Sequence, residues 1–308
     1  MSDHVLVIGA GGFIGRHLVQ ALAAAGDRVI AVSRRSIPFQ SNNIESIACE
    51  AKEPEHYAPW IARSRVVVHV ASRSTPGSTV GNALADLEEN LRPTLALLQA
   101  MQQKPQINLL YLSSGGTLYG NDSGHIATEA SAVAPRSYHG AGKIAAEHFI
   151  AAWSRQYGGA ATIVRPSNVY GPGQNERSGF GIIPACFGKM SRGETLTVWG
   201  DGSTVRDYLY IGDFIDLCQS ILSCPMSPGA TVLNAASGVG VSLNELFLQL
   251  ENITGIRLLR IYDAARKVDT PRVVIDPTLA ESLYGWMPTT PLNQGLENAW
   301  HWFNTTQH

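Results

Sequence analysis

The sequence predicts an α/β protein built on a doubly wound parallel sheet, with a smaller substrate-binding region toward the C-terminus. Short apolar runs alternate with helix-like segments up to residue 171, as strands buried between two helical layers require. Beyond that point the elements shorten, and glycine and proline become more frequent. We therefore expect one domain over residues 1–171, to which 209–224 return, and a second region made mainly of 172–208 and 225–308.

The composition is that of an ordinary globular chain. With 308 residues, 44% hydrophobic and 16% charged, it can bury a large core, and its net charge of −2 gives no reason to expect nucleic acid or an anionic membrane as a partner. No apolar run reaches the roughly 18 residues of a membrane helix, and a strand begins too early for a signal peptide. The four cysteines lack CxxC or metal-ligand spacing. We expect a cytoplasmic protein with buried free thiols and no metal.

A strand, a glycine-rich turn and a helix open the chain. The apolar run VLVIG at 5–9 leads into GAGGFIG, and a helical pattern then runs to Gly26, before the next strand at 28–33. Glycines three residues apart permit a tight turn and close approach to a pyrophosphate, which the free N–H groups of the helix start can bind. This pattern predicts a Rossmann-like dinucleotide site formed by Gly9, Gly12, Phe13, Ile14 and Gly15.

The end of the second strand indicates which dinucleotide is bound. NAD sites usually place Asp or Glu there to bind the ribose 2′-hydroxyl, whereas this chain has Ser33, Arg34 and Arg35. Two guanidinium groups suit a 2′-phosphate. The sequence therefore predicts NADP, with NAD also possible, unless the arginines are only solvated surface residues.

Further elements follow in the order that a doubly wound sheet requires. The predicted strands are 66–72, 107–114 and 161–171, and the predicted helices are 82–101 and a segment that holds Lys143 and runs toward Tyr157. Pro93 interrupts the helical rhythm of 82–101 and predicts a kink or junction there.

Several stretches resemble the extended short-chain dehydrogenase/reductase family, and within it the nucleotide-sugar epimerases and dehydratases. They are GAGGFIG, VVHVAS, SSGGTLYG, RPSNVYGPG, WGDGSTVRDYLYIGD, LNAASGVGVSLNEL and DTPRVVIDPTLAESLYGW, which together span nearly the whole chain. The resemblance implies a nucleotide sugar as substrate, typically a UDP-hexose, and hydride exchange with a nicotinamide, most often at C4 of the sugar. It also implies a homodimer formed through the helices near 82–101 and 139–157.

The resemblance assigns roles to individual residues. Lys143 matches the lysine that holds the nicotinamide ribose, and the other cofactor contacts are Ala71, Pro166 and Ser167. The matching substrate contacts are Asn168, Arg206 and Arg272, the two arginines at the diphosphate. Plainer explanations are a turn formed by the Asn168 side chain, salt bridges for the arginines and a helix-surface position for Lys143.

The chain departs from the family pattern after the strand at 107–114. Where the family has Ser or Thr, this chain has Gly115, so that Ser114 or Thr117 would have to supply the hydroxyl. Thr117 is the better candidate, because the family often has a small polar residue facing the sugar there. Either hydroxyl could instead satisfy only loop backbone groups.

A second departure concerns the family's Tyr-x-x-x-Lys pair, which is replaced here by SYHGAGK. Residues four apart on a helix lie within about 40° of each other and residues five apart differ by about 140°, so His139 shares the face of Lys143 and Tyr138 does not. Gly140 and Gly142 would permit a distortion that brings Tyr138 back. Imidazole titrates near pH 6.5 and phenol near 10, so either could serve as the acid/base residue; His139 could also be only a packing residue.

Three functions are compatible with these observations. Full-length resemblance favours a UDP-hexose C4 epimerase, and Arg34 with Arg35 favours an NADPH-dependent nucleotide-sugar 4-ketoreductase. Gly115 and His139 together leave room for a nucleotide-sugar binding protein without turnover.

Overall fold

The computed structural model describes residues 3–74, 82–120, 124–176, 181–266 and 269–306. The chain divides into two compact units: unit 1 comprises Met1–Ser114, Tyr138–Arg165 and Ile215–Leu233, and unit 2 comprises Gly115–Ser137, Pro166–Phe214 and Asn234–His308. Each unit is made of three chain segments. Residues 115–137 belong to unit 2 because Ala127 forms a bridge with Ile275 there. The chain returns to unit 1 over 215–233 rather than 209–224.

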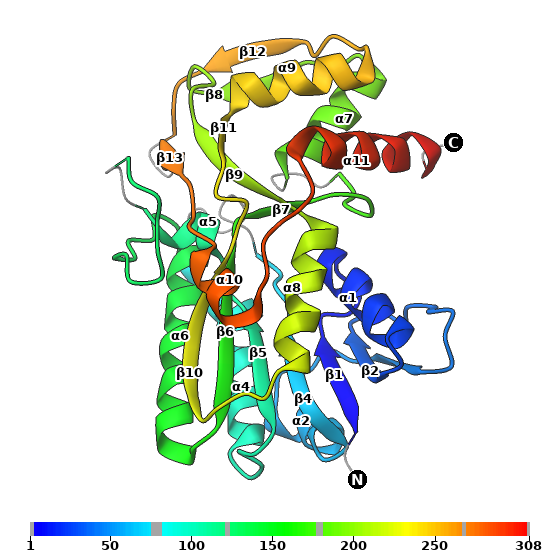
Figure 1. Cartoon of the computed structure of the whole chain (residues 1–308), viewed down its shortest axis with the longest axis vertical. Coiled ribbons are helices and arrows are strands. Elements are labelled where there is room, and N and C mark those ends of the chain that lie inside the picture. Colours follow the sequence, from blue (N-terminus) through cyan, green and yellow to red (C-terminus); the bar gives the residue numbers. More distant parts are fainter. Residues whose placement is uncertain (1–2, 75–81, 121–123, 177–180, 267–268, 307–308) are drawn as a thin grey trace. The chain divides into compact units, whose positions relative to one another are not determined.

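Unit 1 is a seven-stranded sheet with helices on both faces, in the order β10-β6-β5-β4-β1-β2-β3 (Figure 1). The strands are β1 (His4–Ile8), β2 (Arg28–Ser33), β3 (Ile44–Ala48), β4 (Ser64–His69), β5 (Asn108–Leu112), β6 (Ala160–Pro166) and β10 (Gly229–Ala235). From β3 to β6 every neighbouring pair is parallel. The expected Rossmann-like doubly wound fold is thereby confirmed.

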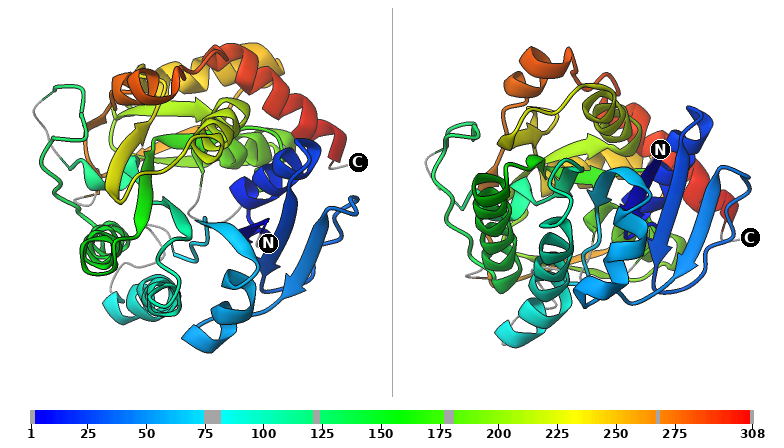
Figure 2. Two further views of the ribbon diagram at one scale, coloured as in Figure 1. Left: turned by 60° about the horizontal axis from the view of Figure 1, so that its bottom comes forward. Right: turned by 90° about the horizontal axis from the view of Figure 1, so that it is seen from below.

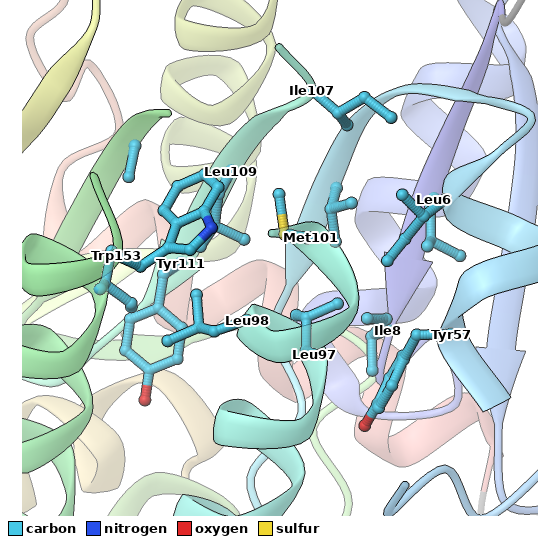
Figure 3. Packing of buried hydrophobic residues seen from close by; sticks show 14 of the residues in the cluster. Leu6, Ile8, Tyr57, Leu97, Leu98, Met101, Ile107, Leu109, Tyr111 and Trp153 are labelled. Atoms are coloured by element: carbon cyan, nitrogen blue, oxygen red, sulfur yellow. The ribbon is translucent and has the colours of Figure 1, made fainter. Parts of the chain in front are cut away.

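Helices α2, α4 and α6 form a row on one face of this sheet, as Figure 2 shows, and α1 and α8 cover the other. The helices are α1 (Phe13–Ala24), α2 (Pro54–Ile61), α4 (Arg92–Met101), α6 (Tyr138–Tyr157) and α8 (Ile211–Ser223). The core between the sheet and the row is mainly apolar, with the buried pair His69 and Thr94 beside it. Figure 3 shows Leu6, Ile8, Tyr57, Leu97, Leu98, Met101, Ile107, Leu109, Tyr111 and Trp153 within it. This packing fixes α6 against β5.

The segment expected as one helix over 82–101 consists of three pieces. A short helix α3 (Ala83–Asp86) passes into a π-helical turn η1 (Leu87–Leu91) and then into α4. Pro93, at the start of α4, cannot donate a backbone hydrogen bond to the preceding turn, and the π-helical turn lies at this junction. The expected junction is present, and the π-helical turn sets the direction in which the residues of α3 and η1 face.

Unit 2 contains two small sheets and a helical layer. Its strands are β7 (Asn168–Tyr170), β8 (Leu196–Trp199), β9 (Val205–Tyr210), β11 (Gly240–Ser242), β12 (Arg260–Asp263) and β13 (Arg272–Val273), and its helices are α5 (Gly115–Leu118), α7 (Ile182–Arg192), α9 (Leu243–Thr254), α10 (Thr278–Tyr284) and α11 (Leu292–Thr306). Strand β9 lies between β11 and β13 and also pairs with β7. The strand expected at 161–171 is therefore two strands, because proline at 166 cannot continue the hydrogen-bond ladder and the chain changes sheets after it.

None of the helices in the described ranges is both long and apolar enough to cross a membrane. All four cysteines carry free thiols. Cys186 and Cys218 are buried as expected, whereas Cys49 is half-buried and Cys224 is exposed.

Candidate active site

The glycine loop lies at the point where the strand order of unit 1 reverses, at the end of β1. Gly9 has a φ of +96°, and a Cβ there would stand only 2.6 Å from the backbone nitrogen of Ala71, just beyond β4. A Cβ on Gly15 would collide with the carbonyl oxygen of Gly9. The ends of β1 and β4 and the start of α1 thus lie so close together that only glycine fits at positions 9 and 15. Gly12 is the N-cap of α1 and supplies no side-chain cap, so the helix start is left for another acceptor.

This loop fits a dinucleotide pyrophosphate, because it combines a backbone cradle that a Cβ would fill with an uncapped helix N-terminus. Phe13 and Ile14 are the first two residues of α1 and are half-buried beside it. The structure thus brings together the predicted residues Gly9, Gly12, Phe13, Ile14, Gly15 and Ala71.

The end of β2 carries no carboxylate. The hydroxyl of Ser33 donates a 2.7 Å hydrogen bond to the carbonyl oxygen of Arg35. The side chains of Arg34 and Arg35 are exposed, and neither forms an ion pair with any carboxylate in the described parts of the chain. Both guanidinium groups are therefore available to an anionic ligand, such as a 2′-phosphate.

Lys143 lies on the buried face of α6, with a residue exposure of 6%. Its Nζ donates a 2.8 Å hydrogen bond to the carbonyl oxygen of Leu112 and lies 5.0 Å from the centre of the Tyr111 ring. Burial lowers the pKa of Lys143 to about 8, although the carboxylates of Asp86 and Glu147 oppose this. The ammonium group is thus held at the end of β5, next to the strand end that leads to Ser114.

His139 lies one helical turn before Lys143 and on the same face. His139 is only 7% exposed, whereas Tyr138, the first residue of α6, is 49% exposed. Helix α6 is α-helical from Tyr138 onward, so the distortion that would recruit Tyr138 is absent from this described helix. Burial lowers the pKa of His139 below its ordinary value, and Lys143 adds to this, whereas Asp86 opposes it. The imidazole is accordingly neutral at pH 7.

A buried polar cluster that the sequence did not reveal surrounds the imidazole. His139 Nδ1 lies 2.8 Å from Ser74 Oγ, which in turn lies 2.5 Å from Asp86 Oδ1. Asn90 Nδ2 donates to both, at 2.6 Å to Ser74 Oγ and 2.8 Å to Asp86 Oδ1. Ser74 and Asp86 lie far from His139 in the sequence and in no shared spacing pattern, so only the folded chain brings them together.

The two candidate hydroxyls follow β5 in sequence but belong to different units. Ser114 is the last residue of its segment in unit 1, and Thr117 lies in α5 of unit 2. Both are half-buried. In unit 2, Asn168 Nδ2 donates a 2.9 Å hydrogen bond to the carbonyl oxygen of Asp207. Its side chain lies beside Gly116, the residue before Thr117.

Pro166 and Ser167 connect β6 to β7 and are both buried. The backbone N–H of Ser167 donates a 2.8 Å hydrogen bond to the carbonyl oxygen of Ala235. This bond holds the connection against the end of β10.

The two predicted diphosphate ligands, Arg206 and Arg272, lie on adjacent strands but not on the same face. Val273 is the partner of Arg206 in the register of β13 with β9, and Arg272 is the partner of Val205. Since paired residues share a face and neighbours along a strand alternate, the structure does not bring the two arginines together. Arg206 is held by the carbonyl oxygens of Val205 and Thr270, at 2.9 and 2.7 Å.

A third arginine, which the sequence analysis did not select, contributes to the field at Arg206. Burial lowers the pKa of Arg206, Tyr208 and Asp269 oppose this, and the positive charge of Arg266 adds a smaller lowering. Arg266 forms an ion pair with Asp269 and lies 5.6 Å from the Trp199 ring. Two guanidinium groups, with one carboxylate between them in the electrostatic balance, therefore lie in this part of unit 2 as candidates for a diphosphate. In the sequence, Arg266 is distinguished only by its position in the loop before β13.

Comparison with known proteins gives full-length matches. A model of the NAD dependent epimerase/dehydratase family matches residues 5–236. A UDP-glucose 4-epimerase of Mycolicibacterium smegmatis is 27% identical over 308 residues, covering 97% of each chain. A dTDP-4-dehydro-6-deoxy-D-allose reductase of a Streptomyces species is 28% identical over 323 residues, covering 97% of this chain and 95% of the reductase. The crystal structure of a UDP-glucose 4-epimerase with UDP-glucose from Thermotoga maritima matches with a TM-score of 0.92 at 29% identity, over 99% of this chain and 100% of that one.

Proposed function

Because the chain belongs to the NAD dependent epimerase/dehydratase family, we propose that it is a UDP-hexose 4-epimerase that oxidises its sugar transiently at C4 and reduces it again on the other face. The observation that carries this proposal is the placement of His139 and Lys143 on one buried face of α6. Likeness over the full chain to proteins named UDP-glucose 4-epimerase supports the choice of reaction.

In this proposal His139 is the acid/base residue. When bound, the dinucleotide supplies the acceptor and donor of hydride. The neutral imidazole of His139 takes the proton of the sugar 4-hydroxyl during oxidation and returns it during reduction. Lys143, which stays charged up to about pH 8, holds the nicotinamide ribose. A hydroxyl from Thr117 or Ser114 binds the same sugar oxygen.

The substrate contacts in the proposal come from unit 2. Arg206 and Arg266 bind the diphosphate through charge-assisted hydrogen bonds, and Asn168 contacts the sugar. Arg272 is the remaining candidate for the diphosphate. The register of β13 with β9 argues against this role, because it places Arg272 and Arg206 on opposite faces.

The second candidate function is an NADPH-dependent nucleotide-sugar 4-ketoreductase. It is favoured by the free guanidinium groups of Arg34 and Arg35 and by the reductase relative. We further propose that the protein binds NADP in preference to NAD, or uses both. A cofactor recycled in place does not need the reducing pool that NADPH represents, so strict NADPH use would favour the reductase.

One incubation series tests these functions. The purified protein is mixed with UDP-glucose, UDP-galactose, UDP-glucuronic acid and 4-keto nucleotide sugars, with and without NADPH. Interconversion of C4 epimers without added reductant supports the epimerase, and stoichiometric NADPH oxidation by a keto sugar supports the reductase. Binding of nucleotide sugars without any turnover would favour the third hypothesis, a non-catalytic nucleotide-sugar binding protein.

Two variants identify the acid/base residue in the same assay. His139→Gln is expected to lower turnover by about 10²-fold or more, the usual contribution of a general acid or base, while nucleotide-sugar binding is retained. Tyr138→Phe is expected to stay within about two-fold of the wild type, because the Tyr138 side chain is half exposed. The opposite pattern would assign the role to Tyr138.

The proposal includes a homodimer and a cytoplasmic location. Large apolar side chains are exposed on α3, η1 and α6, namely Leu84, Leu87, Phe149 and Tyr157. A second copy that covers them would remove this apolar surface from water. Light scattering on the purified protein would measure the mass directly, and Phe149→Glu should shift it toward the monomer.

A further inference from the structure

We propose that Ser74 and Asp86 fix the tautomer of His139, so that Nδ1 carries the ring proton and Nε2 is the unprotonated acceptor. The assignment of Nε2 to the sugar hydroxyl rests on the proposed function, whereas the tautomer itself follows from the hydrogen bonds alone. Ser74 and Asp86 are accordingly positioning residues that act through His139.

The first step is the orientation of the Asn90 side chain. Its Oδ1 accepts a 2.8 Å hydrogen bond from the backbone N–H of Arg73, which only an oxygen can do. Its Nδ2 must therefore be the atom that faces Ser74 Oγ at 2.6 Å, and there it can only donate. One acceptor site of the Ser74 hydroxyl is thus filled.

The second step concerns the single proton of Ser74. Asp86 is 3% exposed, and although burial raises the pKa of its carboxyl group, the nearby His139 ring and the hydrogen bonds from Ser74 and Asn90 outweigh this and leave the pKa below its ordinary value. Asp86 is therefore ionised and can only accept. The 2.5 Å contact between Ser74 Oγ and Asp86 Oδ1 consequently uses the hydroxyl proton of Ser74.

The third step assigns His139. Ser74 has no second proton to give, so its 2.8 Å contact with His139 Nδ1 requires the ring nitrogen to donate. The direct distance from Nδ1 to Asp86 Oδ1, 3.8 Å, is too long for a hydrogen bond, so Ser74 is the bridge. With the opposite tautomer the Ser74 proton would point to Nδ1, and the two buried oxygens of Ser74 and Asp86 would face each other at 2.5 Å with no proton between them. Since a neutral imidazole carries one ring proton, Nε2 is then unprotonated and keeps its lone pair.

The test is the ring ¹⁵N spectrum of the full-length protein with its dinucleotide, labelled at histidine. The His139 signals are those that disappear in His139→Gln. We expect a protonated Nδ1 and an unprotonated Nε2 in the wild type, and a reversal or mixture in Ser74→Ala. Ser223→Ala, the same change at an exposed serine at the end of α8, is the matched control and should leave the spectrum unchanged. A wild-type signal with the proton on Nε2 would overturn the proposal.

A second readout separates positioning from a structural role. Ser74→Ala and Asp86→Asn should lower kcat roughly ten- to hundred-fold with little change in KM. Asp86 and Lys143 are the charged groups that affect His139, and Asp86 raises its pKa. In Asp86→Asn the acidic limb of the kcat profile should therefore move to lower pH. If Asp86→Asn lost stability but the acidic limb of its kcat profile stayed at the wild-type pH, the positioning role of Asp86 would be contradicted.

The two experiments also separate this inference from the proposed function. If no sugar is turned over but Nδ1 carries the proton, the epimerase proposal fails and the tautomer stands. If epimerisation occurs with the proton on Nε2, only the tautomer assignment fails.

Discussion

Gly142 of α6 packs directly against the carboxylate of Asp86. A methyl group at this position would collide with Asp86 Oδ2. Glycine inside a helix costs roughly 0.5–1 kcal/mol relative to alanine, so its presence here needs a reason other than helix stability. The reason is close approach: without a side chain at 142, Asp86 can reach the cluster that holds His139.

Gly142→Ala should therefore destabilise the protein, by about 1–3 kcal/mol, and lower turnover, because the new methyl group displaces Asp86. Urea unfolding measures the first effect and the epimerase assay the second. A double-mutant cycle with Asp86→Ala provides the control. Once the carboxylate is removed, the same glycine-to-alanine change should become neutral or stabilising. An equal penalty in both backgrounds would place the collision elsewhere.

Lys143→Met should raise stability at neutral pH while it abolishes turnover. Burial lowers the pKa of Lys143 from 10.5 to about 8, so the folded state holds a charge at pH 7 at a cost in free energy. Since a tenfold change in proton affinity corresponds to about 1.4 kcal/mol, the gain in the free energy of unfolding is at most about 3 kcal/mol. The variant also loses the hydrogen bond from Lys143 to the carbonyl oxygen of Leu112, which reduces this gain in stability.

The pH dependence checks this explanation. Between pH 8 and 10.5 the unfolded chain binds a proton that the native protein does not, so wild-type stability rises with pH across this window. The advantage of Lys143→Met should thus be greatest below pH 8 and vanish near 10.5. Urea unfolding at pH 7 and at pH 10 would show it, with Lys104→Met as the control. A gain that is independent of pH would point to packing instead.

Arg34→Ala and Arg35→Ala should each weaken NADP⁺ binding about tenfold or more, since each removes a charge-assisted contact to the 2′-phosphate. NAD⁺ has no such phosphate and should bind each variant as it binds the wild type. Titration calorimetry with both dinucleotides measures this. Arg28→Ala, at the start of β2 and with a 67% exposed side chain, is the control. Equal or tighter binding of NAD⁺ by the wild type, unchanged in both variants, would remove the NADP proposal.

Arg206→Lys and Arg266→Ala should weaken the binding of UDP about tenfold, because each loses hydrogen bonds to the diphosphate. Arg272→Ala should have little effect, since Arg272 faces the other side of the β9–β13 pair. The affinity for UDP, measured by calorimetry, decides between them. If Arg272→Ala weakened UDP binding most among the three variants, Arg272 would be the diphosphate ligand that the family resemblance implies. The role proposed for Arg266 would then be wrong.

The fold and the dinucleotide loop could be predicted because they depend on local patterns. Buried strands appear in the sequence as apolar runs. The φ of +96° at Gly9 favours glycine, so the sequence shows a glycine at this turn. The shared face of His139 and Lys143 was also predictable, since it follows from helical geometry once α6 is regular. The NADP preference, by contrast, stays a prediction.

Other parts of the site depend on long-range packing, which no spacing encodes. Ser74 follows β4, Asp86 ends α3 and His139 lies in the first turn of α6, so these residues meet only through the packing of separate elements. The faces of Arg206 and Arg272 depend on strand register, and a shift by one residue would reverse them.

The most direct test of the epimerase proposal follows an isotope at C4. UDP-glucose labelled with deuterium at C4 of the sugar is incubated with the purified protein, without added reductant, and the products are examined by mass spectrometry and NMR. We predict UDP-galactose that retains the deuterium, because the hydride removed from C4 returns to the same carbon, and formation of this product at least about 10²-fold more slowly with His139→Gln. Absence of any epimer of UDP-glucose, or an epimer that has lost the deuterium, would contradict the account.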